Sequence, residues 1–176
     1  PLASARRALD ERDFAAATEA AQRVLAGDAQ NAEARRILDE VRRLEGEATR
    51  AAAQVRAALD AGDVERAQQL LPKLQPLDPR QAAQLQVRLR DILSGRAQEG
   101  RRGADAAQAG LDAAHAVLPD AEAGRRALQQ GDAALRSGQW GEAARLFAEA
   151  REAFGRARRT PIGTAATPRP LATPTP

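Results

Sequence analysis

The stretch ALDERDFAAATEAAQRVLAGDAQNAEARRIL, residues 8–38, sets the architecture of this chain. Asp13 can accept a hydrogen bond from the first free amides of a following helix, and Gly27-Asp28 can end that helix. Asn31 can cap the next one. The apolar residues between the first two signals recur at helical spacing: Phe14, Ala17, Ala21, Val24 and Leu25. The stretch therefore predicts a helical hairpin and its junction to another helix.

Two later stretches repeat this arrangement of turn, apolar stripe and helix end. One contains Gly62-Asp63-Val64, Ala67, Leu71 and Leu77-Asp78-Pro79, and the other contains Gly131, Gly138, Trp140, Ala143, Phe147 and Ala150. The pattern resembles the tetratricopeptide repeat (TPR). Val64 follows Phe14 by 50 residues and Trp140 follows Val64 by 76, whereas the family period is about 34. The resemblance therefore implies an all-α fold of TPR-like helical hairpins joined by long helices, either an α-solenoid or an elongated bundle.

Composition agrees with this class. The chain has 176 residues, of which 43% are hydrophobic but only 2% aromatic, so alanine supplies most of the apolar surface. Such a core must be built by close packing of helix on helix, and no alternating stretch indicates a sheet. Cysteine is absent from the sequence, which excludes disulfides and thiolate metal sites.

The charged residues are numerous and mixed. The 27 Lys and Arg residues face 24 Asp and Glu residues, for a formal net charge of +3. Acidic residues are interspersed among the arginines, which favours a solvated surface over a nucleic-acid site. Clusters such as Arg101-Arg102 and Arg158-Arg159 have no interleaved aromatic residues on which bases could stack. A weak basic nucleic-acid-binding module is therefore the third-ranked function.

The predicted organisation is one TPR-like helical domain over residues 1–159, with hairpins near 2–26, 47–75 and 121–159. The stretch SGRAQEGRRG at 94–103 contains three glycines and is expected to be either a flexible break or a frayed helix. A helix should resume over 104–118 and stop at Pro119, with Asp120 capping the next one. Five prolines and five threonines among residues 160–176 predict a disordered linker.

No residue pattern indicates catalysis. His115 is the only histidine, and it has no neighbouring histidine with which to bind a metal. The three serines have no nucleophile-elbow context. Trp140 is expected to be the hydrophobic anchor of the last hairpin. We therefore expect no enzyme activity, no cofactor, no metal and no small-molecule substrate, and no run of apolar residues predicts membrane insertion of this segment.

The TPR resemblance implies a candidate peptide groove, because in that family the first helix of each hairpin lines a concave surface that grips a partner peptide. The matching positions form three sets: Arg6, Leu9 and Asp10; Arg56, Leu59 and Asp60; Asp132, Leu135 and Arg136. Arginine can pair with a carboxylate in bidentate geometry, so an acidic or C-terminal peptide is the expected ligand. The Lys/Asn clamp of chaperone-binding members is absent from these positions.

The leading hypothesis is a non-catalytic scaffold for protein–protein interaction, a module of a larger bacterial protein. Similar hairpins followed by Thr-Pro linkers occur in multidomain bacterial proteins, including non-catalytic portions of serine/threonine kinases. The alternative is a structural, coiled-coil-like helical spacer between domains. The chain begins with Pro1, so we expect it to be cut from a longer protein; no secretory signal pattern is visible, which favours the cytoplasm.

Overall fold

The computed structural model describes residues 1–163, and this part of the chain is all-helical, as the sequence predicts. It contains eight α-helices and no strand within these residues. The predicted linker over 160–176 lies outside the described residues from residue 164 onward. The chain forms two compact units, Pro1–Ile92 and Leu93–Pro176, where the sequence predicted one helical domain over 1–159.

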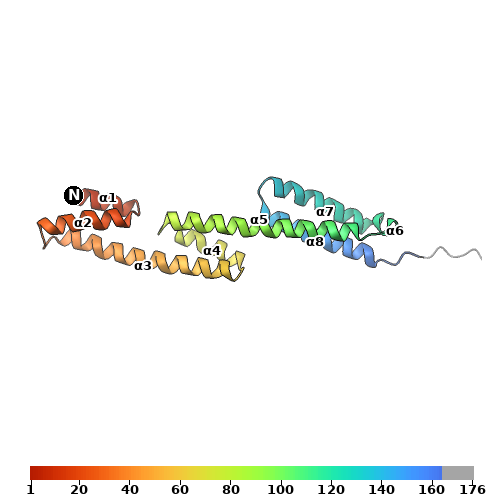
Figure 1. Cartoon of the computed structure of the whole chain (residues 1–176), viewed down its shortest axis with the longest axis horizontal. Helices are drawn as coiled ribbons and strands as arrows, with labels where there is room; N and C mark the ends of the chain where they lie inside the picture. The colour runs from red at the N-terminus through yellow and green to blue at the C-terminus, as the bar shows by residue number, and fades with distance from the viewer. Residues whose placement is uncertain (164–176) are drawn as a thin grey trace, which may run out of the picture. The chain divides into compact units, whose positions relative to one another are not determined.

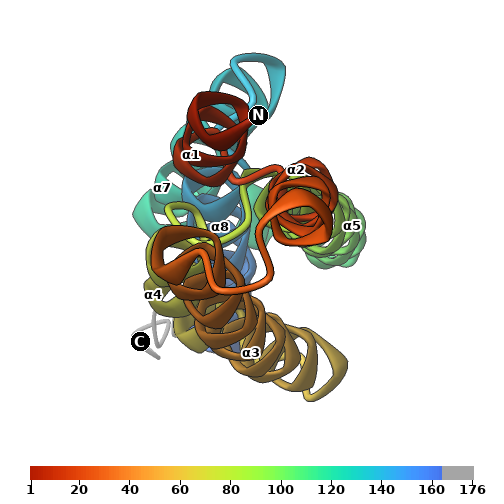
Figure 2. The ribbon, with the colours of Figure 1, turned by 90° about the vertical axis from the view of Figure 1, so that its left-hand side faces the viewer.

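The first unit begins with a three-helix group made by α1 (Leu2–Asp10), α2 (Phe14–Gly27) and the start of α3 (Ala32–Asp60). Figures 1 and 2 show α1 and α2 lying against the first part of α3. Small residues meet at the centre and allow the close approach that the composition predicts. The buried cluster consists of Ala5, Ala8, Ala17, Ala21, Ala34, Ile37 and Val41.

The second part of the first unit is organised by the other half of α3. This helix spans 29 residues without interruption, so Gly46 is tolerated inside it. It packs against α4 (Val64–Leu74), which begins directly after the Gly62-Asp63 turn and ends two residues after Pro72. The first residues of α5 (Pro79–Ala109) also contact α3, because Arg56 donates to Gln81.

The sequence predicts either a flexible break or a frayed helix over residues 94–103. In the structure these residues are helical, and they form no flexible break. α5 spans 31 residues and contributes to both units. Two of the three glycines of this stretch lie against α8 (Trp140–Arg159): a Cβ at Gly100 would lie 3.3 Å from the Cβ of Phe147, and one at Gly103 would lie 3.6 Å from the Cδ of Arg151. Tertiary packing thus outweighs the low helix propensity of glycine.

The helix predicted over 104–118 is wrong in detail. α5 ends at Ala109, and a short helix, α6 (Ala113–Ala116), follows with Asp112 as its N-cap. α7 (Pro119–Arg136) is preceded by Leu118 at the N-cap position, so Asp120 lies in the first turn and is not the cap. Proline is favoured at the first helical position because its missing N–H has no partner there in any case.

The core of the second unit depends on two phenylalanines of α8. Phe147 and Phe154 are fully buried. Each ring lies over a glycine of α7, since a Cβ would be 2.6 Å from Phe154 Cε1 at Gly124 and 2.6 Å from Phe147 Cε1 at Gly131. The two helices can therefore approach closely, and alanines fill the rest of the contact.

Candidate functional site

The three predicted hairpins, α1–α2, α3–α4 and α7–α8, have the same turn. In each, the residue before the second helix donates its backbone N–H to a carbonyl five residues earlier: Asp13 to Ala8 (2.8 Å), Asp63 to Ala58 (2.8 Å) and Gln139 to Ala134 (2.9 Å). This is the bond that closes a Schellman-type helix end. The side chains of Asp13 and Asp63 also accept from the amides of Ala16 and Arg66, as predicted for N-caps.

The middle residue of each turn has a left-handed backbone. Gly62 has a φ of 70° and Gly138 one of 74°, and both are the glycines that the sequence singled out. The first turn instead has Arg12 at φ 60°, a conformation that costs a residue with a Cβ about 1–2 kcal/mol. Its side chain offsets part of that cost, because Nε donates to the carbonyl of Pro76 at 2.9 Å. Arg12 therefore links the first turn to the segment that follows α4.

The first candidate set lies on α1. Arg6 donates through Nε to Glu33 Oε1 of α3 at 2.7 Å, and its Nη2 contacts the same oxygen. Leu9 is half-buried against the first core cluster. Asp10 is exposed and forms no ion pair within residues 1–163.

The second set lies at the C-terminal end of α3 and is more fully engaged. Arg56 donates to Gln81 Oε1 at 2.6 Å. Asp60 accepts from Arg88 Nη2 at 2.6 Å, so two contacts hold α5 against this end of α3. Leu59 is only 3% exposed, which makes it a core residue of the first unit.

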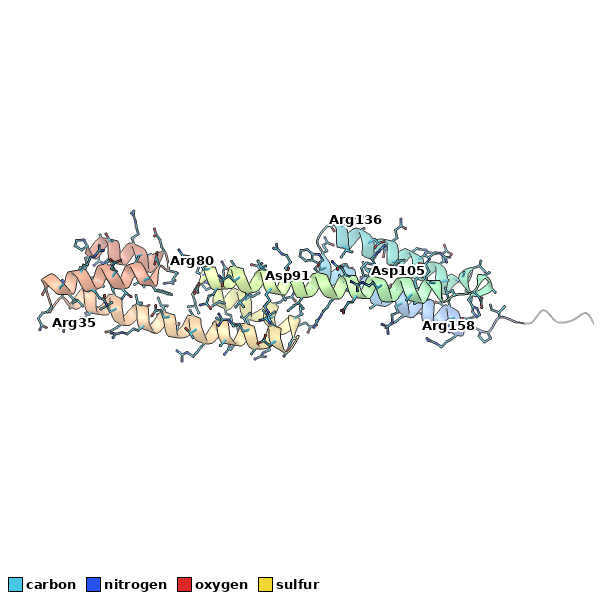
Figure 3. The ribbon with its side chains drawn as sticks, in the orientation of Figure 1. Arg35, Arg80, Asp91, Asp105, Arg136 and Arg158 are labelled. Atoms are coloured by element: carbon cyan, nitrogen blue, oxygen red, sulfur yellow. The ribbon has the colours of Figure 1, made fainter. Side chains whose placement is uncertain are left out.

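The third set lies on α7 and faces a helix that precedes it in the chain. Asp132 accepts from Arg101 Nε of α5 at 2.6 Å, and this hydrogen bond raises the pKa of Arg101. Leu135 is half-buried against the core of the second unit. Arg136 is exposed at the end of α7, as Figure 3 shows, and forms no ion pair within the described residues.

The structure therefore gives the three sets a common feature that the sequence reasoning missed. The equivalent positions Arg6, Arg56 and Asp132 each bind a side chain of the neighbouring helix in the same unit. The partners are 25 to 31 residues away in sequence. Complementary residues at that separation were visible in the sequence, but only the helix alignment shows that they meet. Within residues 1–92 no hydrogen bond or ion pair joins the first set to the second.

His115 lies beside its own helix cap. Its backbone N–H donates to Asp112 Oδ1 at 2.9 Å, and its Nδ1 lies 2.7 Å from the same oxygen. The backbone hydrogen bond, followed by the side-chain contact, lowers the pKa of Asp112. His115 is thus part of a local capping arrangement. Among residues 1–163 no group of three or more His, Asp or Glu side chains could hold a metal ion.

The described core contains no buried polar or charged residue. All charged chemistry in this part of the chain therefore lies at the surface. No described helix combines the length and the hydrophobicity that crossing a bilayer requires. Comparison with known proteins places the chain in no family, since no family model, no curated protein and no solved structure matches it.

Proposed function

We propose that this chain is a non-catalytic scaffold whose helical surface binds another protein. The observation that carries the proposal is the recurrence of one hairpin turn, with the same backbone hydrogen bond, at Asp13, Asp63 and Gln139. Recurring helical hairpins are the building unit of repeat proteins, which present extended surfaces to partners.

In each unit, the charged residues at the candidate groove positions supply the chemistry of the exposed surface. Asp10 and Arg136 are exposed and have no internal ion pair within the described residues, so they are available to a partner. Arg6 and Asp132 form exposed ion pairs, which contribute about 0–1 kcal/mol each, and Arg56 forms an exposed hydrogen bond to the neutral amide of Gln81. A partner can therefore compete for them at small cost.

A second candidate, a structural helical spacer, is supported by a different observation. α3 packs against α1 and α2 as well as α4, and α5 contributes to both compact units. Within the first unit, a long helix such as α3 can set the distance between the groups at its two ends without any exposed site. This function requires length and helicity but no particular surface residues.

A replacement experiment distinguishes the two functions. In the protein as the cell makes it, residues 1–159 are exchanged for an unrelated helical segment of equal length. A binding scaffold loses its partner, which is measured by capture from an extract of the cells that make the protein, followed by titration calorimetry with each purified candidate. A spacer keeps the activity of the protein.

The proposal of a scaffold fails if no purified candidate binds the chain, or if the replaced protein retains full activity. It is supported if one purified protein binds at a defined stoichiometry and if the exchange removes both binding and activity. The candidate groove positions are then tested one unit at a time, with Asp10→Ala in the first unit and Arg136→Ala in the second, and Arg36→Ala is an exposed control for the arginine variant.

A further inference from the structure

A groove in the second unit is lined by arginines that the contacts described above leave unused. It lies between α5 and α8 and has a volume of about 480 Å³. Ala107 has a small side chain and Gly155 has none, so a ligand can lie close to both helices. The other lining residues are charged: Arg151, Glu152, Arg156 and Arg159.

The arginines of the groove are available for a ligand. Arg151 and Arg159 form no hydrogen bond or ion pair within residues 1–163, and neither does Arg158 at the same end of α8, labelled in Figure 3. Arg156 makes one long contact, 3.3 Å from its Nε to Asp120 Oδ1. Three arginines against one glutamate leave the lining positively charged.

Two glycines near the end of α5 show where Arg158 and Arg151 lie along that helix. The Nη1 atom of Arg158 lies 3.9 Å from the position of a Cβ at Gly110, just beyond the end of α5. Arg151 crosses α5 at Gly103, where its Cδ and Nη1 lie 3.6 and 3.9 Å from the corresponding position. The guanidinium groups are therefore spread along the α5–α8 contact, and one anionic group cannot engage them all.

The dipole of α8 accounts for only part of this cluster. Cations in the last turn of a helix are favourable, which explains Arg158 and Arg159. The helix end itself is closed by Thr160, whose backbone N–H and Oγ1 both donate to the carbonyl of Arg156. Arg151 lies two turns before that end, so the dipole gives no reason for its charge.

We propose that the groove between α5 and α8 binds an acidic peptide segment of a partner protein. Guanidinium groups pair with carboxylates in bidentate geometry, and several carboxylates along a peptide match several separated arginines. A nucleic-acid strand fits less well, because no aromatic side chain lines the groove on which bases could stack. The inference rests on the proposed scaffold function and adds the partner class and the surface.

The experiment measures binding of fluorescently labelled peptides to the full chain by anisotropy. The probe is a peptide in which glutamate alternates with serine and glycine, and the matched control has glutamine in place of glutamate. The groove variant is Arg151→Gln/Arg159→Gln, which removes the two lining arginines that form no internal pair. The control variant, Arg36→Gln/Arg66→Gln, removes the same charge from exposed arginines of the first unit that also form no ion pair.

We expect the glutamate peptide to bind, the glutamine peptide not to bind, and the groove variant to lose about tenfold or more in affinity. That loss corresponds to about threefold for each of the two lining arginines removed. The control variant should lose less than about threefold, and added salt should weaken binding to the wild-type chain. Circular dichroism checks that both variants remain folded, which the absence of internal ion pairs at these arginines favours.

Three results overturn the inference: no binding of the glutamate peptide, equal loss in the two variants, or tighter binding of single-stranded DNA or anionic vesicles through the same arginines. The scaffold function is judged separately. If a purified partner binds the groove variant as well as the wild-type chain, the groove assignment fails while the scaffold function stands. If no purified partner binds either chain, the scaffold function itself fails.

Discussion

Replacing Gly131 with alanine should destabilise the second unit, although the same change stabilises most helices. The added Cβ would lie 2.6, 2.8 and 3.1 Å from Cε1, Cδ1 and Cζ of Phe147, whereas ordinary contact begins at about 3.4 Å. The ring cannot move away freely, because Phe147 is fully buried and Gly100 of α5 lies against its Cβ. The closest ring atom would therefore have to move by about 0.8 Å.

The expected magnitude follows from two opposing effects. Overpacking a buried site costs about 1–3 kcal/mol, and replacing glycine with alanine inside a helix returns about 1 kcal/mol. We expect a net loss of up to about 2 kcal/mol in the free energy of unfolding. For a chain of this length that corresponds to a fall in Tm of up to roughly 8 °C.

Thermal and urea unfolding, followed by far-UV circular dichroism and by the fluorescence of Trp140, measure this loss. Gly95→Ala is the matched control, since it lies in α5 with nothing within 4 Å of its Cβ position, and it should gain about 0.5–1 kcal/mol. Adding Phe147→Leu to Gly131→Ala should cost less than Phe147→Leu costs in the wild-type chain, because the smaller side chain relieves the clash. If Gly131→Ala is as stabilising as Gly95→Ala, the close approach of α7 and α8 is wrong.

Three further predictions concern single side chains. Arg12→Ala should lower the free energy of unfolding by about 1 kcal/mol, because the variant loses the hydrogen bond to Pro76 and keeps the left-handed backbone. In urea unfolding, Arg12→Gly should be about 1 kcal/mol more stable than Arg12→Ala. Trp140→Ala should cost less than the 3–5 kcal/mol of a fully buried aromatic, because Trp140 is only half-buried, and an unchanged urea midpoint would show that it does not belong to the core. The hydrogen bond from Arg145 lowers the pKa of Glu142. The ionised Glu142 carboxylate therefore stabilises the fold above its unfolded pKa of about 4.3, and this contribution disappears as the pH falls through the lowered folded value. Glu142→Gln should flatten the acid limb of a titration of the urea midpoint against pH, and an unaltered limb would contradict the pairing.

Local signals predicted much of the helix pattern. The bounds of α4 and the caps at Asp13 and Asp63 follow from side chains that act within three residues of their own position. The turns at Gly62 and Gly138 follow in the same way, because few residues other than glycine adopt a left-handed backbone. Such features depend on sequence neighbours alone, so one sequence is enough to find them.

The errors concern residues whose role depends on a distant helix. Gly100 and Gly103 predict weakness in an isolated helix, and only the presence of α8 shows that they make room for Phe147 and Arg151. The candidate groove has the same difficulty. Arg56 is a candidate groove residue through the TPR resemblance, and its own helix gives no sign of Gln81 of α5 beside it.

The two contacts between glycine and phenylalanine also determine how α7 and α8 align along their length. Alanine-rich helices have nearly uniform surfaces, so many sliding positions would otherwise have similar energies. A slip of one turn would set both rings against residues that carry a Cβ, such as Ala127 and Ala134. A slip of two turns would seat Phe147 at Gly124, but it would carry Phe154 past Pro119, where α7 begins. The Gly131–Phe147 and Gly124–Phe154 contacts therefore favour the observed alignment of α7 and α8 over alignments shifted by one turn.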